Sequence, residues 1–147
     1  NEPYLIEYNV RMGDPECQTI LPLIDSDLLE IIDACCNSKL VTQDIKWKHK
    51  KSMCIVLCSK GYPEKYSQNV EIKNLKELKS AKDNFIFHAG TKSSENKILA
   101  VGGRVINFVN ISDKYSSSRK EIINQIKRLN WENGFYRSDI GHKVIDK

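Results

Sequence analysis

The sequence predicts an α+β fold with a largely antiparallel sheet and a packed C-terminal helix. Several strand-like apolar runs follow one another between residues 53 and 111, and an amphipathic segment comes after them. This order is typical of α+β folds, because successive strands can pair as antiparallel neighbours before a helix covers one face of the sheet. The 147 residues suffice for one ordinary domain, or for a small domain joined to a piece of another.

The composition indicates a globular chain. Hydrophobic residues make up 40% and charged residues 29% of the sequence. We find no apolar run of the roughly 20 residues that a membrane-spanning helix needs, and the N-terminus lacks the basic and apolar regions of a signal peptide. Because the sequence starts without Met and almost inside a strand-like run, we expect it to be cut from a longer polypeptide.

The charge and the cysteines indicate a cytoplasmic protein without nucleic-acid or membrane partners. The net charge of +4 is small, and the lysines at positions 46, 48, 50 and 51 are typical of a solvated loop rather than a nucleic-acid surface. The five cysteines contain no paired CxxC arrangement, so we expect no zinc site. Reduced, buried cysteines are the simplest interpretation.

The segment from residue 4 to residue 11 alternates as a β-strand does. One face carries Tyr4, Ile6 and Tyr8, which we expect to face the core, and the other carries Glu7, Asn9 and Arg11. Two oxygen ligands on one face can hold Mg²⁺, and a guanidinium beyond them suits phosphate or carboxylate. The spacing alone supports this interpretation no better than an exposed strand edge with a Glu–Arg pair.

Two short helices are expected before residue 42. Asp14 is expected to cap the first, over residues 16–21, with Pro15 at its first position and a stop near Pro22. Asp25 or Ser26 should cap the second, with Asp27 in its first turn. A single apolar stripe then follows, formed by Leu28, Ile31, Ile32 and Cys35.

Residues 41–52 are polar and basic and are expected to form a linker. Beyond it we expect a strand over 53–59 that is buried on both faces, a turn over 60–66 and an edge strand over 70–72. Further strands are predicted over 85–88, 98–101 and 104–111, with a polar loop over 89–97. Serines 116–118 should cap the last helix, whose apolar face is Ile122, Ile123, Ile126 and Leu129, and Asn133-Gly134 indicates a turn.

Five motifs in this order resemble the phosphoribosylamine–glycine ligase family: "IEYNVRMGDPECQ", "LCSKGYPEKY", "FHAGT", "GGRV" and "GFYRSDIGHKVI". The resemblance implies that residues 1–42 are the C-terminal end of an ATP-grasp domain and that residues 43–147 are the C-terminal domain of the ligase. It also implies an ATP-dependent reaction of purine biosynthesis. Glycine would be activated as glycyl phosphate and joined to 5-phosphoribosylamine, giving glycinamide ribonucleotide, ADP and phosphate.

The resemblance also implies roles for individual residues. Glu7 and Asn9 would ligate the Mg²⁺ or Mn²⁺ that bridges the ATP phosphates, and Arg11 would contact phosphate or the activated carboxylate. Asp14 and Glu16 could orient an amine, although helix capping explains Asp14 equally well. Lys92 and Arg104 could hold a ribose phosphate, with ordinary surface charge as the alternative.

Other polar residues are expected to be structural. His88 should be packed or hydrogen-bonded, and Arg137, Asp139 and His142 should form a local network near the C-terminus. The segment "GTKSSENK" lacks the order of a phosphate-binding loop. We therefore expect the chain to need the N-terminal remainder of the polypeptide and to be inactive alone.

Two alternative functions remain open from the sequence. One is another ATP-grasp enzyme of purine synthesis, and the other is a non-enzymatic basic α+β binding module.

Overall fold

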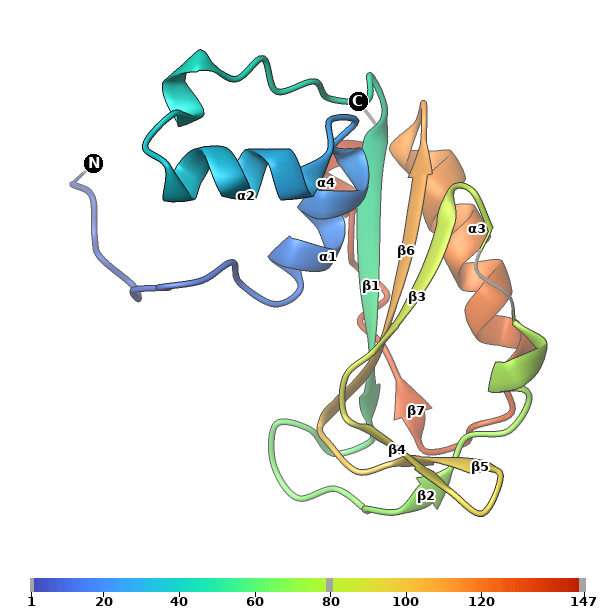
Figure 1. Ribbon diagram of the computed structural model, residues 1–147. Helices are drawn as coiled ribbons and strands as arrows, with labels where there is room; N and C mark the ends of the chain where they lie inside the picture. Colours follow the sequence, from blue (N-terminus) through green and yellow to red (C-terminus); the bar gives the residue numbers. More distant parts are fainter. Residues whose placement is uncertain (1, 79–80, 146–147) are drawn as a thin grey trace.

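The computed structural model describes residues 2–78 and 81–145, and these residues form two antiparallel sheets with helices on both faces of the larger one (Figure 1). The larger sheet has the order β3-β6-β1-β7. Its strands are β3 (Asn84–His88), β6 (Arg104–Ser112), β1 (Lys51–Ser59) and β7 (Gly134–Phe135). This arrangement confirms the predicted antiparallel α+β architecture.

The core lies between the larger sheet and the helix α3 (Tyr115–Arg128). The central pair of strands, β1 and β6, is in antiparallel register, with Ile55 opposite Phe108. Both side chains are fully buried and meet Ile122 and Ile126 of α3 in the same cluster. The predicted apolar face of the last helix is confirmed, because Ile123 and Leu129 also pack against this core.

The opposite face of the sheet contacts the short helix α1 (Glu16–Ile20). Figure 1 shows α1 and α3 on opposite sides of β1 and β6. On the α1 face, Cys54, Val56 and Cys58 are only half-buried. The expectation that β1 is buried on both faces is therefore met in full only on the α3 side.

The smaller sheet has the order β2-β5-β4, with β2 (Val70–Glu71), β5 (Lys97–Ala100) and β4 (Thr91–Ser94). The chain passes between the two sheets where Gly90 and Gly102 approach closely. A Cβ on Gly90 would lie 2.6 Å from the Gly102 Cα, so the crossing requires glycine. The Gly90 carbonyl accepts hydrogen bonds from the amides of Val101 and Gly102.

The prediction of a loop over residues 89–97 is wrong, because β4 and β5 form a hairpin there. Glu95 and Asn96 make its turn with positive φ angles of 45° and 66°, as two-residue hairpin turns require. The sequence signal was weak because β4 is the polar run Thr-Lys-Ser-Ser, whose middle residues are exposed. A strand without a buried face has no hydrophobic alternation to reveal it.

The N-terminal strand predicted from residue 4 is also absent. Residues 2–9 have no regular secondary structure, and Tyr4, Ile6 and Tyr8 are 83%, 93% and 83% exposed instead of facing the core. An extended segment becomes a strand only when a neighbour pairs with its amides and carbonyls. None of the strands in the described part of the chain pairs with it.

Both early helices form, but with different caps from those predicted. Pro15 rather than Asp14 precedes α1, and no side chain caps it. The α-helix ends at Ile20, near Pro22 as predicted, and the chain continues as the 3₁₀ turn η1 (Leu21–Leu23), which contains Pro22. Asp27, not Asp25 or Ser26, caps α2 (Leu28–Cys36), because its carboxylate accepts a 2.8 Å bond from the Leu29 amide.

The apolar stripe of α2 is mostly exposed in this structure. Leu28 is 39% and Ile32 is 50% accessible, and Ala34 is the one buried residue of the helix. The region predicted as a linker, residues 41–52, overlaps the 3₁₀ turn η2 (Leu40–Thr42), and an isolated bridge pairs its Trp47 with Ile24, the residue after η1. The elements before this region also contact the larger sheet, because α1 touches β1 and β6 and η1 touches β1.

The last helix begins without a side-chain cap, which corrects the predicted role of serines 116–118. Lys114 precedes α3, and Ser118 is buried, with its hydroxyl 2.7 Å from that of Ser112.

The turn over 60–66, the edge strand β2 and the turn at Asn133-Gly134 are confirmed. The remaining short elements are η3 (Leu75–Glu77) and α4 (His142–Ile145). No helix in the described ranges is long and apolar enough to cross a bilayer.

Candidate functional site

Asp14 and Arg104 form the polar centre of the candidate site. Arg104 is the first residue of β6, and its side chain reaches the loop that precedes α1. Its Nη1 donates to the Asp14 carbonyl at 3.0 Å, and its Nη2 lies 3.2 Å from the Asp14 carboxylate. The structure therefore brings together two of the residues that the sequence singled out, from positions 90 apart.

A hollow of about 440 Å³ lies beside this ion pair, on the α1 face of the larger sheet. Its size is in the range of small-ligand pockets. The floor is apolar and comes from β1, whereas polar and aromatic groups come from loops around it. The residues used below are Pro15, Cys58, Tyr62, Arg104, Tyr136 and Arg137.

The two thiols on the floor of the hollow are poor nucleophiles. Burial raises the pKa of Cys54 to about 12, against which a hydrogen bond from Thr19 acts more weakly. Burial also raises the pKa of Cys58, although the nearby Arg104 guanidinium lowers it in part. Because the thiolate is the reactive form, these cysteines form an apolar surface and do not supply covalent chemistry near neutral pH.

All five cysteines are free, as expected, but they are not all buried. Cys35 and Cys36 at the end of α2 are exposed, and the other three are half-buried. The apolar partners that would cover Cys35 are missing because α2 contacts little of the described structure.

The C-terminal segment forms one wall of the hollow. After β7, Tyr136, Arg137 and Ile140 line it. Arg137 and Asp139 pair through two bonds, 3.0 Å from Nε to Oδ1 and 2.6 Å from Nη2 to Oδ2. This pairing raises the pKa of Arg137 and lowers that of Asp139. His142 Nδ1 lies 2.7 Å from the Asp139 carbonyl, so the predicted local network is confirmed.

Glu7, Asn9 and Arg11 form a chain of side-chain contacts on the exposed N-terminal segment. Asn9 Nδ2 donates to Glu7 Oε1 at 2.9 Å, and Arg11 Nη1 donates to Asn9 Oδ1 at 2.7 Å. The side chains therefore lie side by side without the strand that we expected. In this arrangement the Asn9 amide presents its nitrogen, not its oxygen, to Glu7.

The donor set of Glu7 and Asn9 fits part of a magnesium site. Turning the exposed Asn9 amide over would place two hard oxygens next to each other, and Mg²⁺ often takes one or two protein oxygens together with phosphate and water. Within residues 2–78 and 81–145, we find no group of three or more His, Cys, Asp or Glu side chains able to hold a metal. The pair would thus supply only a share of the ligands.

The other predicted residues lie apart from the ion pair or are engaged locally. Glu16 accepts a 3.1 Å bond from the Gly13 amide through Oε2. Lys92 is exposed on β4 of the smaller sheet, opposite Leu99, and is not one of the residues that line the hollow. His88 is hydrogen-bonded as predicted, with Nδ1 2.9 Å from the Thr91 hydroxyl.

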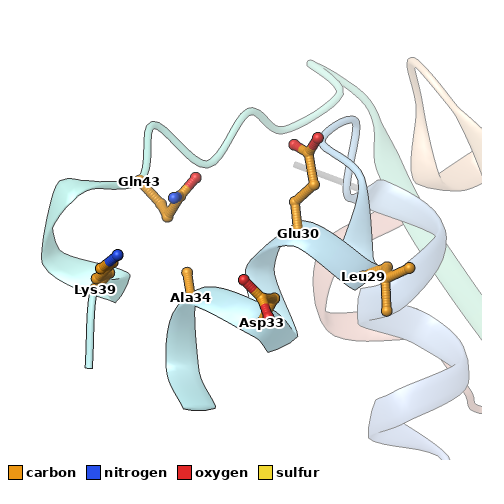
Figure 2. Close-up of a pocket in the computed structure, with 6 residues that line it drawn as sticks. All are labelled: Leu29, Glu30, Asp33, Ala34, Lys39 and Gln43. Carbon is orange, nitrogen blue, oxygen red and sulfur yellow. The ribbon is translucent and has the colours of Figure 1, made fainter. Parts of the chain in front are cut away.

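A larger hollow of about 640 Å³ lies between α2 and the chain that follows it. Figure 2 shows Gln43 and Ala34 pointing toward each other across it, with Glu30 and Asp33 extending from α2. None of the predicted site residues lines it. We favour the smaller hollow as the functional one, because only that hollow combines an apolar floor with the Asp14–Arg104 pair.

Tyr62 and Tyr136, the aromatic residues that line the smaller hollow, were not predicted from the sequence as site residues, and Arg137 was predicted to be structural only. The signal was available in part, because these residues lie in the motifs "KGYPEKY" and "GFYRSDIGHKVI". Their meeting at one hollow could not be derived, since β1 and β7 had first to be paired through Cys58 and Phe135.

Comparison with known proteins gives consistent matches. The family described as phosphoribosylglycinamide synthetase, C domain, matches residues 52–143. A phosphoribosylamine–glycine ligase of Caldanaerobacter subterraneus is 42% identical over 138 residues, which cover 94% of this chain and 32% of that protein. The corresponding ligase of Fusobacterium nucleatum is also 42% identical, over 95% of this chain and 33% of its own length.

A eukaryotic relative and a solved structure agree with these matches. The bifunctional purine biosynthetic protein purD of Dictyostelium discoideum is 40% identical over 97% of this chain and 18% of its own length. The crystal structure of phosphoribosylamine–glycine ligase from Thermotoga maritima aligns with a TM-score of 0.70 and 25% identity, over 95% of this chain and 34% of that one. The chain spans about a third of the length of the bacterial relatives that it matches. From these similarities we conclude that the chain belongs to the phosphoribosylglycinamide synthetase family and contains its C domain.

Proposed function

We propose that this chain is the C-terminal part of an ATP-dependent ligase that joins glycine to 5-phosphoribosylamine in purine biosynthesis. The products would be glycinamide ribonucleotide, ADP and phosphate. The observation that carries this proposal is the Asp14–Arg104 contact at the edge of an apolar hollow. It places an acidic loop from the first part of the chain against the start of a strand from the second part.

The hollow suits a small sugar phosphate that carries an amine. Arg104 keeps N–H donors beyond the two that contact Asp14, and a guanidinium binds phosphate well because its donors are planar and permanently charged. The Asp14 carboxylate lies next to it and could orient the amine of phosphoribosylamine, together with Glu16. Lys92 is proposed only as a more distant positive charge for this phosphate, because it lies on the smaller sheet and outside the hollow.

The exposed N-terminal segment would supply the phosphoryl-transfer end of the site. Glu7 and Asn9 would hold Mg²⁺ or Mn²⁺, which supplies charge neutralisation for the ATP phosphates when bound. Arg11 would contact the phosphate or the activated glycine carboxylate. Formation of glycyl phosphate and attack by the amine need no protein nucleophile, so positioning and charge stabilisation provide the catalysis.

The exposed apolar side chains in the first part of the chain support the proposal that they contact another domain of the same polypeptide. A large group of them lies outside the core: Tyr4, Leu5, Ile6, Tyr8, Val10, Leu28, Leu29, Ile32 and Val41. Large apolar side chains exposed in such number between residues 4 and 41 indicate that this part of the chain meets a partner surface. We propose that residues 1–42 are the end of an ATP-grasp domain, that residues 43–147 are the C-terminal domain, and that the 147-residue chain alone is inactive. The site of action would be the cytoplasm.

The test is an assay of the complete polypeptide for ADP release. We expect release to require both glycine and phosphoribosylamine, and the 147-residue chain to show none. Release that depends on bicarbonate or formate instead would contradict the substrate assignment. In the same assay, Arg104→Ala should raise the KM for phosphoribosylamine with little change in the KM for ATP, whereas the reverse pattern would place Arg104 on the nucleotide side.

A further inference from the structure

Two guanidinium groups reach the same hollow from opposite sides of β1. Cys58 of β1 has Arg104 of β6 as its partner on one side and Phe135 of β7 on the other. Neighbouring strands are about 5 Å apart, so the two flanking backbones are separated by about 10 Å at this point. Arg137 follows Phe135 by two residues and lines the hollow together with Arg104. Side chains as long as arginine can converge on one anion across such a gap.

Arg137 keeps donors available for a ligand. Its bonds to Asp139 use Nε and one N–H of Nη2, which leaves three of the five N–H groups of the guanidinium. The Arg137 side chain is 72% exposed, so those donors are accessible. Asp139 holds the plane of the group in one orientation, as a bidentate carboxylate does.

The wall that carries Arg137 is held in place by several contacts. Arg119 of α3 donates through Nε to the Ile140 carbonyl at 3.2 Å and through Nη2 to the Ser138 carbonyl. Gly141 has a φ of +84°, and a Cβ there would lie 2.6 Å from the Met53 side chain. Figure 1 shows the chain after β7 running back past β1 to α4. The segment that carries Arg137 is therefore fixed by contacts with α3 and β1.

From this geometry we propose that Arg137 is a second phosphate-binding residue of the hollow, acting with Arg104 on the phosphate of the sugar-phosphate substrate. The inference rests on the proposed function and extends it. Lys92, the second cation expected from the sequence, does not line the hollow, whereas Arg137 does. The competing interpretation is that Arg137 only stabilises its own turn through Asp139.

Ribose 5-phosphate is a suitable probe, because it carries the phosphate without the reactive amine, and ribose is its uncharged counterpart. Binding to the complete polypeptide would be measured by titration calorimetry. We expect Arg137→Gln to weaken ribose 5-phosphate by about 10- to 100-fold, the range for loss of a charge-assisted hydrogen bond to an anion. Ribose binding and the KM values for ATP and glycine should not change.

Asp139→Asn separates the two interpretations. It removes the ion pair and one of the two acceptor oxygens but leaves the Arg137 cation in place, so ribose 5-phosphate should bind at least as tightly as in the wild type. Equal losses in Arg137→Gln and Asp139→Asn would assign Arg137 to the turn alone and overturn the inference. Arg128→Gln is the matched control, because it also removes one arginine charge, at the exposed end of α3. It should leave ribose 5-phosphate binding unchanged.

Arg104→Gln distinguishes failure of this inference from failure of the proposed function. If Arg104→Gln weakens ribose 5-phosphate and Arg137→Gln does not, the inference is wrong and the proposed function stands. If the wild type does not bind ribose 5-phosphate at all and does not use phosphoribosylamine, both are wrong.

Discussion

Arg104 binds Asp14 through both of its terminal nitrogens, at 3.0 Å to the carbonyl and 3.2 Å to the carboxylate. This contact joins the acidic loop before α1 to the start of β6, and it stands at the edge of the apolar hollow. Each partner also has a proposed task toward the substrate. The ion pair therefore has both a structural and a functional consequence, which can be separated experimentally.

The structural consequence is predicted to be small. The two side chains are 43% and 33% exposed, and partly exposed ion pairs typically stabilise proteins by about 0.2 to 1 kcal/mol. A double-mutant cycle with Asp14→Asn and Arg104→Gln, followed by urea unfolding of the 147-residue protein, should give a coupling free energy in that range. The matched pair Asp14→Asn and Arg128→Gln should be additive. A coupling above 2 kcal/mol would mean that the contact is far better shielded from water than this structure shows.

Glu7→Gln in the complete polypeptide should lower turnover at ordinary magnesium concentration. The change removes one negative charge and one good oxygen ligand while keeping the size of the side chain, so the metal should bind more weakly. Partial recovery at high magnesium is expected, measured as ADP release over a magnesium titration. Glu2→Gln makes the same charge change on the exposed part of the same segment and should have little effect. Identical magnesium dependence in the two variants would remove Glu7 from the metal site.

Cys54 should react slowly with a thiol reagent such as dithionitrobenzoate at pH 8. With a pKa of about 12, about one molecule in 10⁴ carries the Cys54 thiolate at that pH. The thiolate fraction, and with it the rate, should rise about tenfold per pH unit until the pH approaches 12. The exposed Cys35 and Cys36 should react first, and all five thiols should react together in denaturant. Rapid modification of Cys54 in the folded protein, identified by peptide mass, would show that its surroundings are less apolar than described.

Phe108→Ala should destabilise the protein by about 3 to 5 kcal/mol, because Phe108 is fully buried between the sheet and α3 and its loss leaves a cavity. The measurement is the free energy of unfolding of the 147-residue protein from urea titration. Val41→Ala is the matched control, since Val41 is 94% exposed and its truncation should change stability by less than about 0.5 kcal/mol. Equal effects of the two substitutions would contradict the placement of the core.

Local patterns determined most of the secondary structure. The apolar run of β1, the long strand β6 and the stripe of α3 were predicted because burial of one or both faces imposes a hydrophobic period on the sequence. The motifs around Asn9, Tyr62, Arg104 and Arg137 also indicated the family, and the family comparison confirmed it.

Only the tertiary structure decided which polar residues meet. Asp14 reaches Arg104 instead of capping a helix, because β6 brings the guanidinium beside the loop. Arg137 joins the hollow because β7 pairs with the end of β1. The exposed segment over residues 2–9 shows the converse, since its strand-like alternation is not matched by any pairing partner in the described structure. The spacing of apolar residues along the sequence indicates which side chains are suited to burial. Contacts between distant positions depend on which strands pair and in which register, and this spacing alone does not determine that pairing.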